Sequence, residues 1–329
     1  MTRRTRYALI GTGDRARAYV RALLHEHREP AELIALLDAV PVHLDRFEDY
    51  IRGLAADGRS PVRYGAGGLE RMIDEQKIDR VILTTPDPTH ADLTCRSLLA
   101  GADVIVEPPL TMDDAGARRI ASAIEASGRE VVVAFNQRHA PANTALRELL
   151  SAGGVGRITA VRAEWPSGRD PLLAQASHHF DLVNWWLDDV PARVSATAGD
   201  DLPLAVTVAY RGGATLHYTR RAEDEPLRLV VDGTEGTVEL AREERLTLRR
   251  HGVAEAQEVP IAGPATDADA DADTRLFHAL FRPRETEPPV PRVPDVTAGL
   301  NAAAIGAAAV RSLAAGLPVD IAELDPAVP

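Results

Sequence analysis

Residues 8–20 read ALIGTGDRARAYV, a short apolar run that enters a glycine-rich turn and then a helical pattern. Gly11 allows the tight turn, Gly13 lets the backbone approach a pyrophosphate, and Ala16 replaces a third glycine at the helix–strand contact. Backbone N–H groups at the start of such a helix attract phosphate charge. Asp38, at the end of the next apolar run, can accept hydrogen bonds from both ribose hydroxyls and repel a 2′-phosphate. The stretch therefore predicts a dinucleotide site, with NAD favoured over NADP.

The N-terminal part of the chain alternates short Val/Ile/Leu-rich runs with amphipathic stretches. Near-continuous apolar strands separated by helices are typical of a parallel sheet that is covered on both faces. We therefore predict an α/β fold in which residues 1–135 form a doubly wound Rossmann domain. The expected strands lie at 7–10, 32–38, 79–85, 103–107 and 130–136, and the expected helices at 14–27, 43–55, 67–77, 89–100 and 113–127.

The second half of the chain has a different pattern, in which strand-like stretches dominate. The Gly-rich turn in DGTEGTVEL (232–240) is typical of a connection between antiparallel strands. We predict that residues 136–329 form an α+β domain with a large, mainly antiparallel sheet. The acidic segment 263–274 is expected to be a mobile loop, and 282–295 a proline-rich connector. The expected strands lie at 157–165, 192–198, 204–210, 214–220, 227–233, 236–241 and 245–250, and the expected helices at 141–152, 174–187 and 296–315.

Composition limits the classes of partner. The chain has 329 residues and a formal net charge of −12, which argues against nucleic acid or an anionic membrane surface as a partner. Cys95 is the only cysteine, so an internal disulfide and a multi-cysteine metal site are excluded, and no metal is expected. No apolar run approaches the roughly 18 residues of a membrane span. The N-terminal segment lacks the longer apolar stretch of a cleaved signal, so we expect a cytoplasmic protein.

Six segments follow one another in the order found in the Gfo/Idh/MocA oxidoreductases, and the chain resembles that family from residue 6 to about residue 320. The segments are GTGDRA, TTPDPTHADLTCRSLLAGADVIVEPPL, AFNQRHAP, GGVGRITAV, SHHFDLVNWWL and DGTEGTVEL. The family contains dehydrogenases and reductases of sugars, cyclitols and related small molecules that use NAD or NADP. The resemblance implies a Rossmann domain followed by a sheet domain, whose face carries the substrate and whose back often forms oligomer contacts. A homodimer or homotetramer is therefore expected.

The resemblance also implies which residues contact the cofactor. Gly11, Thr12, Gly13 and Arg15 would line the pyrophosphate, and Asp38 the adenosine ribose. The remaining positions, which would surround the nicotinamide and its ribose, are Thr84, Thr85, Pro86, His90, Glu107, Pro108 and Asn136.

Pro108 is a departure from the family pattern. Relatives read Glu-Lys-Pro where this chain has Glu107, Pro108 and Pro109, and their lysine contacts the substrate and helps in proton transfer. Proline has no titratable group, so Pro108 cannot replace that lysine. Lys77 is the only lysine of the chain, and it ends a charged helix outside the expected cleft.

His178 is the natural candidate for the acid–base residue. It matches the family histidine that exchanges a proton with the substrate oxygen, and Asp181, three residues on, could fix its tautomer. His179 is a second candidate, although it points about 100° away from His178 on a helix. Ala174 and Gln175 stand where relatives carry Asp or the pair His-Lys, so those groups are missing too.

The resemblance implies that four further side chains border the substrate cleft. Arg138 is the first candidate for contact with an anionic or polyhydroxy ligand. The set comprises Arg138, Arg162, Trp165 and Arg169.

Three functions remain open at this stage. The first, which we favour, is an NAD-dependent oxidoreductase of a sugar, cyclitol or similar small molecule, with His178 as the acid–base residue. The second is a diverged enzyme that catalyses elimination, epimerisation or cyclisation on the same scaffold, for example in secondary metabolism. The third is a nicotinamide-binding regulatory protein. The intact glycine turn and Asp38 favour cofactor binding, whereas Pro108 favours the second function.

Overall fold

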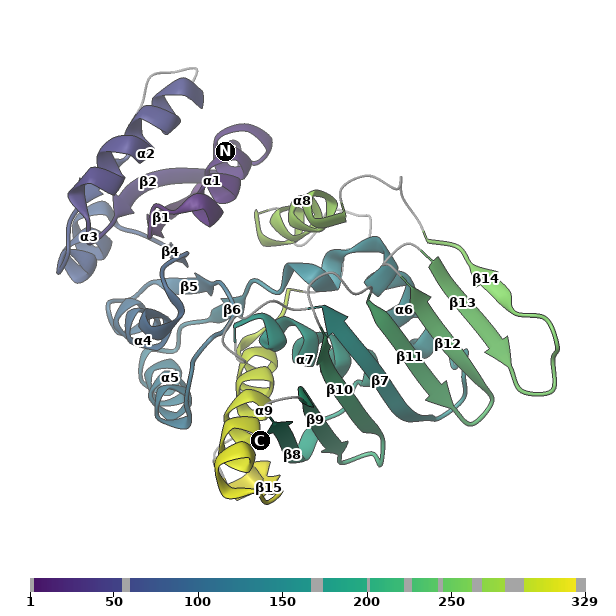
Figure 1. Cartoon of the computed structure of the whole chain (residues 1–329). Coiled ribbons are helices and arrows are strands. Elements are labelled where there is room, and N and C mark those ends of the chain that lie inside the picture. The colour runs from purple at the N-terminus through teal and green to yellow at the C-terminus, as the bar shows by residue number, and fades with distance from the viewer. Residues whose placement is uncertain are drawn as a thin grey trace. The chain divides into compact units, whose positions relative to one another are not determined.

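The computed structural model describes residues 3–54, 60–166, 174–199, 202–221, 227–241, 245–261, 268–281 and 293–323. The chain forms two compact units (Figure 1). Unit 1 comprises Met1–Phe135 and Asp273–Gly299, and unit 2 comprises Asn136–Ala272 and Leu300–Pro329.

Unit 1 contains a parallel sheet whose described strands run in the order β3-β2-β1-β4-β5-β6. The chain order reverses between β1 and β4, and ligands of such sheets bind at the carboxyl ends of the strands beside this point. The sheet confirms the predicted doubly wound architecture. Its strands are β1 (Thr5–Ile10), β2 (Ala31–Leu37), β3 (Val62–Tyr64), β4 (Arg80–Leu83), β5 (Asp103–Val106) and β6 (Val131–Val133). The sequence did not predict β3, which is only three residues long and largely exposed.

Helices follow the strands of unit 1 where the amphipathic stretches predict them. They are α1 (Asp14–Arg21) with its π-helical continuation η1 (Ala22–Glu26), α2 (Pro41–Leu54), α3 (Leu69–Gln76), η2 (Asp87–Thr89), α4 (His90–Leu99) and α5 (Asp114–Ser127). The ends of α5 show why the local sequence folds this way. Asp113 caps the helix by accepting a hydrogen bond from the Gly116 N–H at 2.7 Å, and Gly128 ends it with φ +65°.

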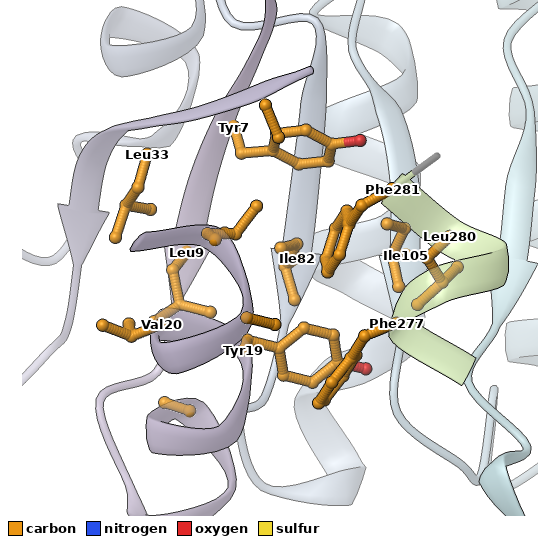
Figure 2. Packing of buried hydrophobic residues seen from close by; sticks show 14 of the residues in the cluster. Tyr7, Leu9, Tyr19, Val20, Leu33, Ile82, Ile105, Phe277, Leu280 and Phe281 are labelled. Carbon is orange, nitrogen blue, oxygen red and sulfur yellow. The ribbon is translucent and has the colours of Figure 1, made fainter. Parts of the chain in front are cut away.

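A helix that the sequence did not predict, α8 (Ala268–Phe281), packs on unit 1. The expectation of a loop over 263–274 is wrong for residues 268–274, which lie in this helix, while 263–267 are outside the described residues. The helix is stabilised by the four apolar residues of its last turns, Leu276, Phe277, Leu280 and Phe281, which are at most 6% exposed. They contact the sheet and α1, where Phe281 meets Tyr7 edge-on and Phe277 packs on Tyr19 (Figure 2). Tertiary packing of the last turns therefore stabilises this helix, although the acidic sequence of its first half does not predict a helix.

Unit 2 contains a mixed sheet in the order β14-β13-β12-β11-β7-β10-β9-β8-β15 among the described residues. β7 and β10 are parallel, and the other neighbours are antiparallel, as predicted. The strands are β7 (Ile158–Pro166), β8 (Pro191–Gly199), β9 (Leu202–Tyr210), β10 (Thr215–Arg221), β11 (Arg228–Gly233), β12 (Gly236–Ala241), β13 (Arg245–Arg250), β14 (Gln257–Val259) and β15 (Val319–Asp320). Along β7, Val161, Ala163 and Trp165 are buried while Arg162 is exposed, so one face of the sheet is apolar and the other polar.

The helical elements of unit 2 are η3 (Asn136–His139), α6 (Pro141–Ser151), α7 (Ala174–Leu187), the long helix α9 (Val296–Ala315), which begins in unit 1, and η4 (Ile321–Glu323). By length and composition, α9 is the one described helix that could span a membrane, but half of its apolar window is buried inside the fold. Ser312 accepts a hydrogen bond from the Ala196 N–H of β8 at 2.9 Å, so α9 packs as a core helix there. Of the predicted connector 282–295, residues 282–292 lie outside the described residues; beyond them, Pro294 accepts a hydrogen bond from the Val133 N–H of β6.

Candidate active site

The glycine turn between β1 and α1 leaves room for a phosphate group. Gly11 has φ +87°, and a Cβ there would lie 2.8 Å from the carbonyl oxygen of Thr84, so only glycine fits. A Cβ at Gly13 would meet nothing within 4 Å, and no side chain caps the start of α1. An open space in front of an uncapped helix start, beside a turn that only glycine can form, fits the pyrophosphate of a dinucleotide.

Asp38 lies at the carboxyl end of β2 and is tied to the same turn. Its Oδ2 accepts hydrogen bonds from the Thr12 N–H at 2.9 Å and the Thr12 hydroxyl at 2.7 Å, and its Oδ1 accepts one from the Val40 N–H at 2.9 Å. Burial raises the pKa of Asp38, but these hydrogen bonds outweigh burial and lower it overall. Oδ1 retains capacity for a ribose hydroxyl, since a carboxylate oxygen can accept two hydrogen bonds. His43, which the sequence analysis missed, lies 3.6 Å from Oδ1.

His90 joins the two turns that follow β4 and β5. Its ring nitrogens lie 2.8 Å from the carbonyl oxygens of Thr85 and Pro109, and the side chain is 1% exposed. The Thr84 hydroxyl donates to the Gly11 carbonyl at 2.8 Å, which fixes the first turn against the glycine turn. His90 therefore holds in place the segments that carry Thr85, Pro86 and Pro108.

Glu107 stands at the carboxyl end of β5 and is held by α1. Its Oε1 accepts hydrogen bonds from Arg15 Nε at 2.8 Å and from the Tyr19 hydroxyl at 2.6 Å. Burial raises the pKa of Glu107, although the charge of Arg15 opposes this. Arg15 Nη1 also donates to Asp273 of α8. Among the residues expected at the cofactor, the structure thus brings Arg15 and Glu107 into direct contact.

In unit 2, Asp181 of α7 pairs with Arg138 of η3. Arg138 donates from Nε and Nη2 to the two carboxylate oxygens at 2.7 and 2.5 Å, and the Arg138 guanidinium lies over the Trp185 ring. From the sequence, Asp181 is expected to orient His178 and Arg138 to bind a ligand. The pairing of these two side chains with each other was not predicted.

His178 is half-buried on α7, and its neighbour His179 is 4% exposed. The His179 ring stacks on Trp165 with centroids 3.7 Å apart and lies 3.2 Å from the Tyr218 hydroxyl through Nδ1. Burial, and then the charge of His178, lowers the pKa of His179 well below its ordinary value. His179 and Trp165 are therefore packed together in the interior, with the imidazole held neutral.

The residues proposed for the substrate do not share one surface. Arg162 is exposed on the polar face of the sheet, where it pairs with Asp232 at 2.5 Å, and Trp165 is buried on the opposite face. Arg169 lies outside the described residues, and Ala174 and Gln175 begin α7. Within the described residues, no group of three or more His, Cys, Asp or Glu side chains could hold a metal ion.

Two family models match the chain. One, described as an oxidoreductase family with an NAD-binding Rossmann fold, covers residues 5–135, and the C-terminal α/β domain of the same oxidoreductase family covers residues 160–321. The chain belongs to the Gfo/Idh/MocA oxidoreductase family. This Gfo/Idh/MocA protein is therefore an oxidoreductase with an NAD-binding domain, and the predicted class of enzyme is confirmed.

Curated relatives and solved structures agree with this assignment. The inositol 2-dehydrogenase of Rhizobium meliloti is 26% identical, and the alignment covers 96% of this chain and 99% of that enzyme. The oxidoreductase YteT of Bacillus subtilis is 29% identical over 54% of this chain, but the match spans only 45% of YteT. An oxidoreductase from Agrobacterium radiobacter, solved in complex with NAD+, L-tartaric acid and magnesium, shares the fold with a TM-score of 0.78 at 19% identity, covering 98% of this chain and 100% of that one.

Besides His43, two side chains of this Gfo/Idh/MocA site were missed from the sequence. Tyr19 could have been found, since it follows Arg15 by four residues on one helix and so shares its face. Asp273 carried no such signal, because nothing in the local sequence links residue 273 with residue 15.

Proposed function

We propose that this oxidoreductase interconverts a hydroxyl and a keto group on a cyclitol or a related sugar, with NAD as the cofactor. The observation that carries the proposal is the geometry around Gly11, Gly13 and Asp38, which fits a dinucleotide. The near full-length similarity to an inositol 2-dehydrogenase supports a cyclitol as the substrate class. Bound NAD supplies the hydride acceptor in the direction of alcohol oxidation.

A residue of the chain must accept the one proton that the substrate releases. In alcohol oxidation the hydroxyl proton leaves the substrate oxygen, and an imidazole nitrogen of His178 accepts it in this proposal. Pro108 offers no such group. His179 cannot substitute easily, because it is buried against Trp165 and its pKa is lowered.

In this proposal, the residues around the glycine turn bind and orient the cofactor. The uncapped start of α1 receives the pyrophosphate, and the free capacity of Asp38 Oδ1 receives a ribose hydroxyl. A low pKa keeps Asp38 ionised at neutral pH, so a 2′-phosphate would meet a negative charge. NAD is therefore favoured over NADP.

Cofactor titration followed by a substrate panel tests the proposal. We expect the purified protein to bind NAD, and to reduce it with at least one cyclitol from a panel of cyclitols and aldoses. Gly11→Ala is the control, because its Cβ would meet Thr84 and should abolish binding. A protein that binds neither NAD nor NADP would contradict the proposal.

A second function is favoured by one observation, the proline at position 108. A site without the lysine could catalyse elimination, epimerisation or cyclisation of a similar polyol on the same scaffold. Conversion of substrate without net change in the nicotinamide would support this function against the first.

We also propose that the polar face of the unit 2 sheet mediates self-association in the cytoplasm. Side chains on this face of β9 are small, namely Ala205, Thr207 and Ala209, and Thr207 faces His217 of β10. Small side chains leave a flat surface that suits contact between two copies. Light scattering should give a dimer or tetramer that Thr207→Arg weakens, and a monomer at micromolar concentration would contradict the proposal.

A further inference from the structure

Arg15 is bound by two carboxylates that come from distant parts of the chain. Its Nε donates to Glu107 at the end of β5, and its Nη1 donates to Asp273 of α8. The guanidinium also lies 5.4 Å from the ring centroid of Tyr19 and 5.9 Å from that of Phe277, two rings that pack together in Figure 2. These contacts fix both the position and the direction of the side chain.

The guanidinium has no nitrogen that is both unbonded and exposed. Nε and Nη1 are engaged by the acids, and Nη2, which has no hydrogen-bond partner among the described residues, is buried. Two of the three guanidinium nitrogens of Arg15 are therefore bound to carboxylates, and the third is buried. A cation in the first turn of a helix is also unfavourable for the helix dipole, and the two acids offset this.

Glu107 receives both of its side-chain hydrogen bonds on a single oxygen. Arg15 and Tyr19 donate to Oε1, while Oε2 accepts no hydrogen bond from the described residues. The backbone N–H of Glu107 donates to the Leu83 carbonyl of β4 at 3.1 Å. Glu107 is thus anchored at its backbone and at one oxygen, directly before the turn that holds Pro108.

We propose that Arg15 is a positioning residue for the Glu107–Pro108 turn, held in that role by Asp273 of α8, and does not bind the pyrophosphate. Asp273 and α8 then belong to the support of the nicotinamide half of the cofactor site. The inference rests on the proposed function in one respect, namely that NAD binds at the glycine turn.

Two ligands distinguish the adenosine–pyrophosphate half of the cofactor site from its nicotinamide half. NAD and ADP-ribose share the adenosine and the pyrophosphate, but ADP-ribose lacks the nicotinamide. Calorimetry should compare their affinities for the full-length wild type, Arg15→Met and Asp273→Asn. Arg17→Met is the matched control, because Arg17 lies on the same helix but is more than half exposed.

Arg15→Met should weaken NAD about tenfold while ADP-ribose changes by less than about threefold. Asp273→Asn should act in the same sense with a smaller loss, about threefold for NAD, because Arg15 keeps its bond to Glu107. Replacing Glu107 by Gln in the Arg15→Met background should restore part of the affinity for NAD, because it removes a buried carboxylate that has lost its cation. Arg17→Met should change neither affinity.

Equal weakening of both ligands by Arg15→Met would overturn the inference, since it would mark a pyrophosphate ligand or a merely structural residue. Tighter binding of ADP-ribose by Asp273→Asn would overturn it too, because Asp273 would then withhold Arg15 from the phosphates. If Arg15→Met does not fold, Arg15→Lys replaces it and should show the same split between the two ligands. A wild type that binds neither ligand would contradict the proposed function instead.

Discussion

Arg138 and Asp181 form a two-pronged ion pair that joins η3 to α7, with side-chain exposures of only 11% and 1%. The charge of Asp181 is therefore balanced from a segment 43 residues away. Because α7 also carries His178, this pair fixes the helix on which the proposed acid–base residue stands.

Removing one partner of this pair should destabilise the protein strongly. Asp181→Asn or Arg138→Met is expected to lower the free energy of unfolding by about 3 kcal/mol, because each leaves a buried charge unpaired. The double variant should lose less free energy of unfolding than the sum of the losses in the two single variants. Chemical denaturation measures all three. Asp320→Asn, which breaks a pair of the same geometry between exposed Arg193 and Asp320, is the control and should lose a small fraction of that amount. Additive losses from the two single variants would contradict a coupled pair.

The buried His179 should make folding stability depend on pH. Its pKa in the folded state lies well below the unfolded value of about 6.5, so its contribution is present above about pH 6.5 and is lost as the pH falls. The loss for one such group reaches about 1.4 kcal/mol for each pH unit. The free energy of unfolding, measured by urea denaturation from about pH 5 to 8, should depend less steeply on pH in His179→Phe, which keeps an aromatic ring on Trp165. An unchanged pH dependence of the free energy of unfolding in this variant would show that His179 is not held neutral.

Asp38 should set the cofactor preference. The wild type is expected to bind NAD more tightly than NADP, and Asp38→Ser should reduce the ratio of the two affinities by about tenfold, because the repelling charge is gone. Fluorescence titration with both cofactors measures the ratio. The neighbouring His43→Ala serves as the control and should leave the preference for NAD in place. Tighter binding of NADP than of NAD by the wild type would contradict the assignment of NAD as the cofactor.

His178 should carry the proton transfer. His178→Ala is expected to lower the turnover number by about 10²-fold or more, since a positioned acid–base group contributes on that order. Lys77→Ala should change it little, because Lys77 is exposed and pairs only with Asp74 among the described residues. Steady-state kinetics with the substrate found in the panel measures both variants. Comparable turnover in His178→Ala and the wild type would remove His178 from the mechanism.

The sequence predicts most of the fold because apolar periodicity and turn residues are local signals. The strands and helices of both sheets lie close to their expected positions, and α9 begins and ends where the Ala-rich stretch does. The short strands β3, β14 and β15 were missed because they mix apolar with charged or polar residues, whereas β6 is equally short but consists of three valines.

The site was harder to predict, because its contacts join distant segments. Glycine positions and Asp38 follow from a compact motif, and the structure shows the geometry that the motif requires. The pairs Arg15–Asp273 and Arg138–Asp181 connect residues far apart in the chain, and a charged residue in a sequence does not name its partner. The acidic half of α8 was interpreted without the apolar residues that follow it, although these anchor the whole helix to unit 1.

The central claim is that hydride transfer continues although Pro108 stands where the resemblance to the family implies a lysine. Single-turnover absorbance of the nicotinamide ring, with enzyme in excess over the cyclitol that the panel identifies, tests it most directly. We predict the formation of one equivalent of reduced nicotinamide for each equivalent of keto product, slowed in His178→Ala and accelerated in Pro108→Lys. Product that forms without any change in nicotinamide absorbance would contradict the claim.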